Sequence, residues 1–421
     1  MKFEDSRGTL FFPIKKDMNF QVVESTVSVN RQYVFRGLHA NPFDKKVTCI
    51  HGRVLDIIIN LDPFHDNYLK PQYFMLDPST ELFQVVVPAN HAHGFLCMEE
   101  NSILIYHFNG HFTPENTTHI HYRDPFLGIT LPIAHDQLIL SEKDQLKNFH
   151  KPVDYLVWGG RGFLGSHLVE TLKEKGKHFV ECSLRLEDTE KIAEILDFYS
   201  PKYVVNAAGL TGVPNIFWCD DHPIQTVETN VTYQMTLAKM CHDRKIHLTV
   251  FGSGGIFKND GEYEEGDRGN FTDNFYARAR ILLEDMISLY PNVLYLRVNY
   301  PMSSRVSPKN LLTKLIGYST ISDTTLSITC VDNLFPLLLD MVEKGETGVC
   351  NFVNPGLISL VEIMSMYQQK YPDHTFEMNK EPSAEAKRST PHLQVQKLLS
   401  YSPLPVVEAV RQIIQYYPKD E

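Results

Sequence analysis

A glycine-rich segment follows a short apolar run in the second half of the chain. The run Tyr155–Trp158 is typical of a buried strand and Ser166–Lys175 of a helix, and a G-x-x-G-x-x-G spacing lies between them. Glycines at such a turn let the backbone approach a pyrophosphate, which then lies at the helix N-terminus where free N–H groups favour anions. The spacing in this context predicts a dinucleotide cofactor site. The predicted contacts are Gly159, Gly160, Arg161, Gly162, Phe163, Leu164 and Gly165.

The next predicted strand indicates which form of the cofactor binds. This strand, Phe179–Ser183, does not end in the acidic residue that would hydrogen-bond the ribose of NAD, and Arg185 follows shortly after. An arginine at this place suits a 2′-phosphate. The sequence therefore favours NADPH over NADH.

Three further segments appear in a characteristic order. Asn206–Gly209 follows a strand, Gly252–Gly255 follows another, and Tyr276–Arg280 opens a helix. This order resembles the extended short-chain dehydrogenase/reductase family. The positions that the resemblance implies are the catalytic Ser253, Tyr276 and Arg280 and the cofactor-binding Ala207 and Ala208.

Position 280 departs from that family, which usually has lysine there. Arg280 is still a cation one helical turn from Tyr276, so it can lower the pKa of the phenol and contact the nicotinamide ribose. A planar guanidinium differs from a compact ammonium, however. The substitution predicts a lowered or remodelled reductase activity.

The second half also resembles a narrower family. Thr211–Cys219, Gly269–Tyr276 and Asn351–Gly356 look like the reductase half of plant-type UDP-rhamnose synthases. In that family a cysteine and a lysine are assigned to epimerisation, and Cys219 and Lys314 match them. The resemblance thus leaves open that the second half epimerises as well as reduces.

The first half carries groups suited to a different reaction. A ketone acidifies the carbons beside it, so inversion of both neighbouring centres of a 4-keto sugar needs a base on one face, an acid on the other and a cation near the enolate oxygen. Phe35–His39, Pro88–Phe95 and Leu140–Asp144 resemble the dTDP-4-keto-6-deoxyglucose 3,5-epimerase family over residues 1–146.

The resemblance to the epimerase family implies individual roles. They are the base His39, its orienting carboxylate Asp144, the proton donor Tyr106, the enolate-stabilising cation Lys45, the phosphate-binding Arg7 and Arg36, and His93, which lines the site. An aromatic residue that usually follows the acid tyrosine is Phe112 here, without a hydroxyl. A metal bound through His91 and His93 is the alternative, because cupins often use two imidazoles and a carboxylate; the resemblance favours a site without metal.

Two patterns of secondary structure must position these groups. From Met1 to about Thr130, short apolar runs alternate with turn signals, which indicates an all-β barrel or jelly roll. The resemblance to the epimerase family implies that this fold is of the cupin type. From Val153 onward strands alternate with helices, which indicates a Rossmann-type, doubly wound parallel sheet. We expect two domains, residues 1–150 and 151–421.

Composition limits the kind of partner. The formal net charge of −11 argues against nucleic acid, and no apolar run approaches the ~20 residues that span a bilayer. The seven cysteines form no C-x-x-C pair and follow no signal peptide, so we expect a soluble, cytoplasmic protein. A homodimer is expected because related epimerases pair.

These observations together predict a fused enzyme. The first half would epimerise a UDP- or dTDP-4-keto-6-deoxyglucose at C3 and C5, and the second would reduce C4 with NADPH to give a nucleotide-linked L-rhamnose. Two alternatives stay open. The sugar could be a 2-acetamido-2,6-dideoxy hexulose with one or both centres inverted, or the chain could bind a nucleotide sugar with one decayed active site.

Overall fold

Nine antiparallel strands of residues 2–151 form two sheets. The computed structural model describes residues 2–6, 8–14, 20–212, 215–259, 261–379 and 391–419. One sheet has the order β3 (Glu24–Asn30), β10 (Ser102–Phe108), β5 (Lys45–His51) and β8 (Gln84–Val87). The other has the order β11 (Thr118–His119), β4 (Phe35–Ala40), β9 (His91–Cys97), β6 (Val54–Asn60) and β7 (Pro71–Leu76). A separate hairpin pairs β1 (Lys2–Asp5) with β2 (Gly8–Phe11).

Alternation along the strands of the five-stranded sheet explains its two apolar faces. On β6, Val54 and Ile58 face the four-stranded sheet, whereas Ile57 and Ile59 face a second cluster with Ile120 and other residues that follow β11. Both faces of this sheet are therefore covered. The all-β cupin-type architecture expected from the sequence is confirmed.

The second unit begins at Pro152 and contains a six-stranded, wholly parallel sheet. Its order is β13 (Phe179–Cys182), β12 (Tyr155–Trp158), β14 (Tyr203–Asn206), β15 (His247–Phe251), β17 (Val293–Val298) and β20 (Gly348–Phe352). The chain leaves β12 for β13 on one side and returns to β14 on the other. In such sheets ligands bind at this reversal, outside the carboxyl ends of the strands.

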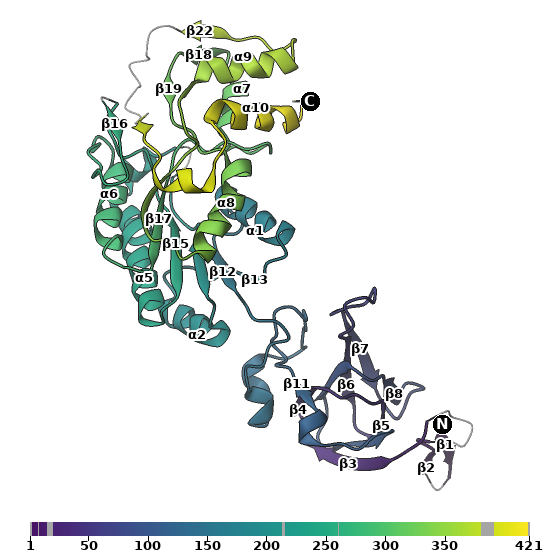
Figure 1. Ribbon diagram of the computed structural model, residues 1–421. Coiled ribbons are helices and arrows are strands. Elements are labelled where there is room, and N and C mark those ends of the chain that lie inside the picture. Colours follow the sequence, from purple (N-terminus) through teal and green to yellow (C-terminus); the bar gives the residue numbers. More distant parts are fainter. Residues whose placement is uncertain are drawn as a thin grey trace. The chain divides into compact units, whose positions relative to one another are not determined.

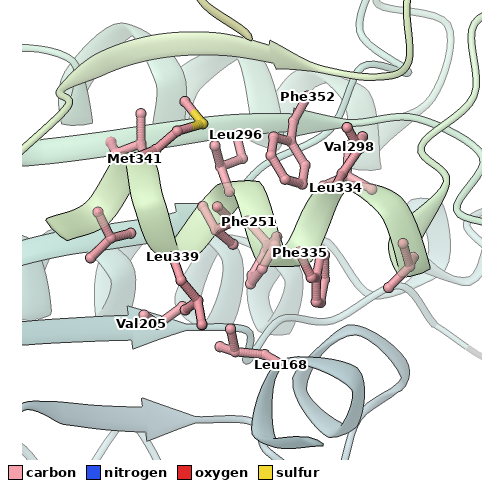
Figure 2. Packing of buried hydrophobic residues seen from close by; sticks show 14 of the residues in the cluster. Leu168, Val205, Phe251, Leu296, Val298, Leu334, Phe335, Leu339, Met341 and Phe352 are labelled. Atoms are coloured by element: carbon pink, nitrogen blue, oxygen red, sulfur yellow. The ribbon is translucent and has the colours of Figure 1, made fainter. Parts of the chain in front are cut away.

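Helices cover both faces of the parallel sheet (Figure 1). One face carries α1 (Phe163–Glu174) and α8 (Val331–Glu343), and the other carries α2 (Thr189–Tyr199), α5 (Tyr233–Asp243) and α6 (Phe275–Ile287). Figure 2 shows Leu334, Phe335 and Leu339 of α8 directed at strand residues such as Phe251 and Val205. The doubly wound sheet expected from the sequence is confirmed.

The helix expected over Thr226–Arg244 differs from the observed one. It begins earlier, as α4 (Pro223–Val227), and a π-helical turn at Glu228–Thr232 precedes α5. Asn230 of that turn is fully buried, donates to the carbonyl of Leu210 (2.7 Å) and accepts from its N–H (2.8 Å). The π turn thus fixes the loop that follows β14.

The second unit also has a smaller lobe that the sequence pattern did not indicate. Its elements are α7 (Leu311–Ile316), β18 (Thr320–Ser322), β19 (Thr325–Leu326), β21 (Ile358–Ser359), α9 (Leu360–Lys370), β22 (Glu377–Asn379) and α10 (Val406–Tyr416). They share a hydrophobic core separate from that of the sheet. Figure 1 shows them grouped beyond one end of the sheet.

Candidate active sites

The inner face of the first unit gathers polar side chains that are far apart in the sequence. His93 of β9 lies opposite His39 of β4, and Phe95 opposite Arg36. Arg36 and His39 are three residues apart, so a regular strand would place them on opposite faces. The register shifts between them, and both residues therefore lie opposite inward-facing residues of β9.

Gly37 makes this irregularity compatible with close strand packing. Its φ is +127°, and a Cβ there would lie 2.5 Å from Cα of Gly94 and 2.7 Å from the His93 carbonyl oxygen. Only glycine accepts such a conformation and approach without strain. Because position 37 carries no side chain, β4 and β9 can approach closely enough to bring His39 and His93 together.

His39 and Asp144 form the central pair of this site. His39 Nε2 lies 3.0 Å from Asp144 Oδ1, and Ser141 donates to the other carboxylate oxygen at 2.7 Å. Burial opposes ionisation of Asp144, but the hydrogen bonds from His39 and Ser141 outweigh it and lower the pKa of the carboxyl. A carboxylate only accepts, so Nε2 carries the proton and Nδ1 keeps the lone pair. The His39 side chain is 29% exposed, which leaves the ring accessible.

A second buried pair and a cation lie on the same inner face. His93 Nε2 is 2.8 Å from Asp56 Oδ2, and Asp56 is fully buried. Lys45 donates to the His39 carbonyl (3.1 Å) and to Asn41 Oδ1 (3.2 Å). Burial lowers the pKa of Lys45 to about 8, with the nearby Asp56 charge opposing the shift. At neutral pH most Lys45 side chains therefore keep their proton. Asp56 was not singled out from the sequence; it reads there as one polar residue inside an apolar strand.

Tyr106 lies on β10, among aromatic rings. Its ring centroid is 6.2 Å from those of Phe95 and Phe108, and Phe108 in turn is 6.1 Å from Phe112. Burial raises the pKa of Tyr106, so the phenol stays protonated at neutral pH. Phe112, the position without a hydroxyl, belongs to the same aromatic wall.

The remaining predicted positions of this unit have different surroundings. Arg36 is exposed, and its Nε donates to Asn30 Oδ1 at 2.8 Å. Arg7 lies outside the described residues. The ring of His91 contacts the Ala89 carbonyl through Nδ1, and that of His93 contacts Asp56 through Nε2.

One residue near His39 was missed by sequence reasoning. His119 of β11 lies directly opposite His39, and the two ring centroids are 4.6 Å apart at an interplanar angle of 76°. Burial lowers the pKa of His119, and its Nδ1 is buried without a hydrogen-bond partner among the described residues. His119 belongs to no motif in the His119–Tyr122 segment, so the sequence gives no signal for this contact.

In the second unit, the glycine turn between β12 and α1 lies against the loop after β14. Gly159 has a φ of +74°, and a Cβ there would lie 2.5 Å from the Ala208 nitrogen; a Cβ on Gly165 would collide with the Gly159 carbonyl. The turn borders a pocket of about 540 Å³. Its lining includes Gly159, Gly160, Arg161, Glu181, Arg185, Ala208, Gly209, Thr229 and Tyr233.

The fit of a dinucleotide to this pocket rests on the turn and on the residues around it. The glycines leave the backbone open where a pyrophosphate would lie. Arg161 also borders a second pocket of about 220 Å³ beside the N-terminal end of α1, together with Arg305 and Ser307. Arg161 offers charge to a phosphate, whereas Arg305 is ion-paired with Glu170. Arg305 was not singled out from the sequence, because it follows β17 by several residues and belongs to no motif.

Glu181 is the unexpected residue of the larger pocket. It precedes the last residue of β13, and a Cβ on Gly160 would lie 2.6 Å from Glu181 Oε2. The side chain of Arg185 is 82% exposed, and its Nη1 atom lies 3.9 Å from Glu187 Oε1. An acid and an arginine thus border the same pocket, near the place where an adenosine ribose binds in this fold.

Two of the predicted reductase residues, Tyr276 and Arg280, lie together near the loop after β14. Ser253 is buried, and its Oγ accepts from the Gly255 N–H at 3.1 Å. The guanidinium carbon of Arg280 lies 5.3 Å from the centroid of the Tyr276 ring. Arg280 is only 4% exposed, and its Nε and Nη1 have no partner among the described residues. A Cβ on Gly209 would be 2.8 Å from Nη2, so the loop held by the π turn lies against this guanidinium.

Cys219 and Lys314 have unlike environments. Cys219 of α3 (Trp218–Asp221) is fully buried, and burial raises the pKa of its thiol despite an opposing influence of Arg280. Lys314 lies on α7 and is exposed. A protonated, buried thiol is a poor base at neutral pH.

Comparisons with known proteins agree with this arrangement. Residues 2–151 match the dTDP-4-dehydrorhamnose 3,5-epimerase family, and residues 155–294 match the NAD dependent epimerase/dehydratase family. A bifunctional dTDP-4-dehydrorhamnose 3,5-epimerase/dTDP-4-dehydrorhamnose reductase of Arabidopsis thaliana is 35% identical over 232 residues, which cover 53% of this chain and 77% of that protein. The fold and the sites define an enzyme that joins an epimerase unit to a reductase unit.

The chain belongs to the family of bifunctional epimerase–reductases that the Arabidopsis protein represents. A trifunctional UDP-glucose 4,6-dehydratase/3,5-epimerase/reductase of the same plant is 34% identical over 227 residues, 52% of this chain but only 34% of that protein. The crystal structure of the L780 UDP-rhamnose synthase from Acanthamoeba polyphaga mimivirus is 26% identical, covers 63% of this chain and all of its own, and has a TM-score of 0.59. No helix among the described residues is long and apolar enough to cross a membrane.

Proposed function

We propose that this enzyme converts UDP-4-keto-6-deoxyglucose to UDP-L-rhamnose, by 3,5-epimerisation in the first unit and 4-keto reduction in the second. The observation that carries the proposal is the His39–Asp144 pair, with a protonated Nε2 and a lone pair on Nδ1. Relatives named for UDP sugars and for dTDP sugars both match the chain. The UDP sugar is chosen because the second half resembles the plant-type synthases.

In the first unit, His39 removes the protons at C5 and C3, and Asp144 holds the ring in the required tautomer. Enolate charge on the C4 oxygen is met by Lys45, which is buried and still largely cationic near pH 7. Tyr106 returns a proton from the opposite face, because burial keeps its phenol protonated. Arg7 and Arg36 are assigned to the diphosphate, and His93, paired with Asp56, lines the site.

In the second unit, a nicotinamide cofactor, when bound, supplies the hydride for C4. Tyr276 protonates the resulting oxygen, Ser253 orients the carbonyl, and Arg280 supplies the positive charge beside the phenol. We assign NADPH because Arg185 suits a 2′-phosphate; Glu181, which lines the same pocket, would instead favour the ribose of NADH.

If Arg185 selects the phosphate, Arg185→Ala should raise the KM for NADPH about tenfold and leave the KM for NADH unchanged. Equal changes for both cofactors would contradict the assignment.

Incubation with UDP-4-keto-6-deoxyglucose in D₂O, with and without NADPH, tests the whole scheme. Deuterium at C3 and C5 by NMR, together with loss of NADPH absorbance, is the expected result. Deuterium exchange without oxidation of NADPH would mean that the second unit has lost its reductase activity, with Arg280 as the substitution responsible. Absence of both reactions would contradict the proposed substrate and direct attention to the acetamido sugar.

Two variants assign the epimerisation to one unit. His39→Ala should abolish exchange at both carbons, whereas Cys219→Ala should retain it, because the Cys219 thiol is buried and protonated. His91→Ala is the matched control, since the ring nitrogen Nδ1 of His91 lies 3.0 Å from the Ala89 carbonyl oxygen and the residue has no role in the proposed reaction. If Cys219→Ala abolishes exchange and His39→Ala does not, epimerisation belongs to the second unit.

We also propose that the enzyme is a homodimer through the first unit. Val27 and Val29 of β3 and Val86 of β8 are 64%, 63% and 52% exposed, and all lie on the four-stranded sheet. These side chains lie on the two opposite edge strands of that sheet, and exposed apolar side chains on one sheet are typical of an interaction surface. Val27→Lys with Val29→Lys should shift the mass measured by light scattering from two chains to one.

A further inference from the structure

Three ligand-type side chains meet beside the ring of His39. One ligand atom each from His39, His119 and Asp144 lies within 4.8 Å of the other two. His119 and His39 come from paired strands, and Asp144 from the short 3-10 helix Lys143–Gln145. Among the described residues, no other group of three or more His, Cys, Asp or Glu side chains meets this criterion.

The environment of this trio suits a transition metal better than a hard cation. Two imidazoles and one carboxylate are ligands that Zn²⁺ accepts, with bonds of about 2.0–2.2 Å and a fourth position left open. His39 Nε2 and Asp144 Oδ1 are already 3.0 Å apart, so a separation larger by only a few tenths of an ångström would let both bind one tetrahedral ion. His119 Nδ1 is buried and has no partner among the described residues. All seven cysteines are buried, so thiolates do not offer an accessible competing site.

We infer that His39, His119 and Asp144 form an inhibitory Zn²⁺ site that is built on the epimerase base. The chemical reason is the tautomer of His39. Asp144 now holds a proton on Nε2 and leaves the lone pair on Nδ1. Zn²⁺ binds the Nε2 nitrogen in place of its proton, and that proton moves to Nδ1, so the ring stays neutral. A ring protonated at Nδ1 and metallated at Nε2 has no lone pair for a substrate C–H. His119 supplies the third ligand, which a His–Asp pair alone lacks.

Titration of the chelator-treated full-length enzyme with Zn²⁺ alone tests the site without any sugar nucleotide. Calorimetry should give one ion per chain, and His119→Asn should weaken binding at least tenfold. His91→Asn, a change of another partly buried histidine in the same unit, should bind like wild type. A chain that binds no Zn²⁺, or a His119→Asn variant that binds like wild type, overturns the inference.

X-ray absorption on the zinc-loaded wild type gives a test that depends on no variant. Two nitrogen scatterers with imidazole outer-shell features and one or two further oxygens are expected. Sulfur at about 2.3 Å would place the ion at a cysteine and overturn the assignment.

The inference that Zn²⁺ inhibits the enzyme rests on the proposed epimerase function. A third measurement distinguishes a failure of that inference from a failure of the proposed function. Zn²⁺ at a saturating concentration should suppress deuterium incorporation by wild type at least tenfold and leave His119→Asn at its metal-free rate. Binding to the trio without suppression overturns the inhibitory role. A wild type that shows no exchange even without Zn²⁺ contradicts the proposed function, whereas the titration still decides the site.

Discussion

The side chain at position 280 is where this chain differs most clearly from the short-chain reductases that it resembles. Its guanidinium is buried over the Tyr276 ring with two nitrogens unpartnered among the described residues, a costly state unless bound cofactor or substrate oxygen accepts from them. We expect Arg280→Met to lower kcat for reduction at least a hundredfold, and Arg280→Lys to stay within about tenfold, because the charge beside the phenol is what the step requires. Stopped-flow NADPH oxidation measures both variants. Equal activity of Arg280→Met and wild type would remove Arg280 from the reaction.

His167 gives the reductase unit a pH-dependent stability. It is 4% exposed in α1, with its ring 5.0 Å from that of Phe163 and 6.5 Å from that of Phe335. Burial, aided by Arg305 and opposed by Asp332, lowers its pKa to about 4. The unfolded chain binds this proton near pH 6.5 and the folded chain does not, so stability is lost as the pH falls through this interval.

The expected loss from His167 alone between pH 7 and pH 5 is on the order of 2 kcal/mol. Urea unfolding of wild type and His167→Leu at both pH values isolates the contribution of His167 to this loss, because the variant lacks the imidazole that binds the proton. The variant should lose less stability than wild type on going from pH 7 to pH 5. Parallel losses would show that His167 is protonated in the folded enzyme.

At the scale of elements, the joint between β4 and β9 depends on one glycine. Gly37→Ala places a methyl group against Gly94 and the His93 carbonyl at a φ of +127°, so we expect a loss of about 3 kcal/mol in unfolding free energy. Gly128 is the matched control, because its φ is +59° and a Cβ there meets nothing within 4 Å. Gly128→Ala should cost about 1 kcal/mol, the effect of φ alone. Thermal unfolding measures both, and similar losses would refute the role of close strand approach.

At the scale of the whole molecule, the two units carry separate hydrophobic cores. Among the described residues, two clusters lie wholly within residues 1–151 and three within residues 152–421. A domain with its own core is expected to fold alone. Residues 1–151 should therefore catalyse deuterium exchange without NADPH, and residues 152–421 should reduce a pre-epimerised 4-keto sugar.

Circular dichroism and activity of the two fragments, compared with their equimolar mixture, check this prediction. The mixture should reproduce the overall conversion at reduced efficiency. Fragments that remain unfolded until they are combined would show that the units stabilise one another.

The sequence by itself determined the two architectures, because alternation of period two and the alternation of strands with helices are local patterns. The glycine turn was readable for the same reason, since its function needs only a strand, a turn and a helix in succession. Resemblance to known families indicated Ser253, Tyr276 and Arg280, and His39 with Asp144, and only the tertiary structure could tell which of these side chains meet.

What the sequence did not indicate depends on contacts between distant segments. Asp56 is a polar residue inside an apolar strand, His119 lies in a two-residue strand that belongs to no motif, and Glu181 stands one residue before the strand end where an acid is sought. Each lies at its site because of strand register, which is set by pairing across the sheet and not by neighbours along the chain. The register shift at Gly37 and the small lobe around α9 are tertiary in the same sense, because their physical cause is the packing of elements that the sequence separates.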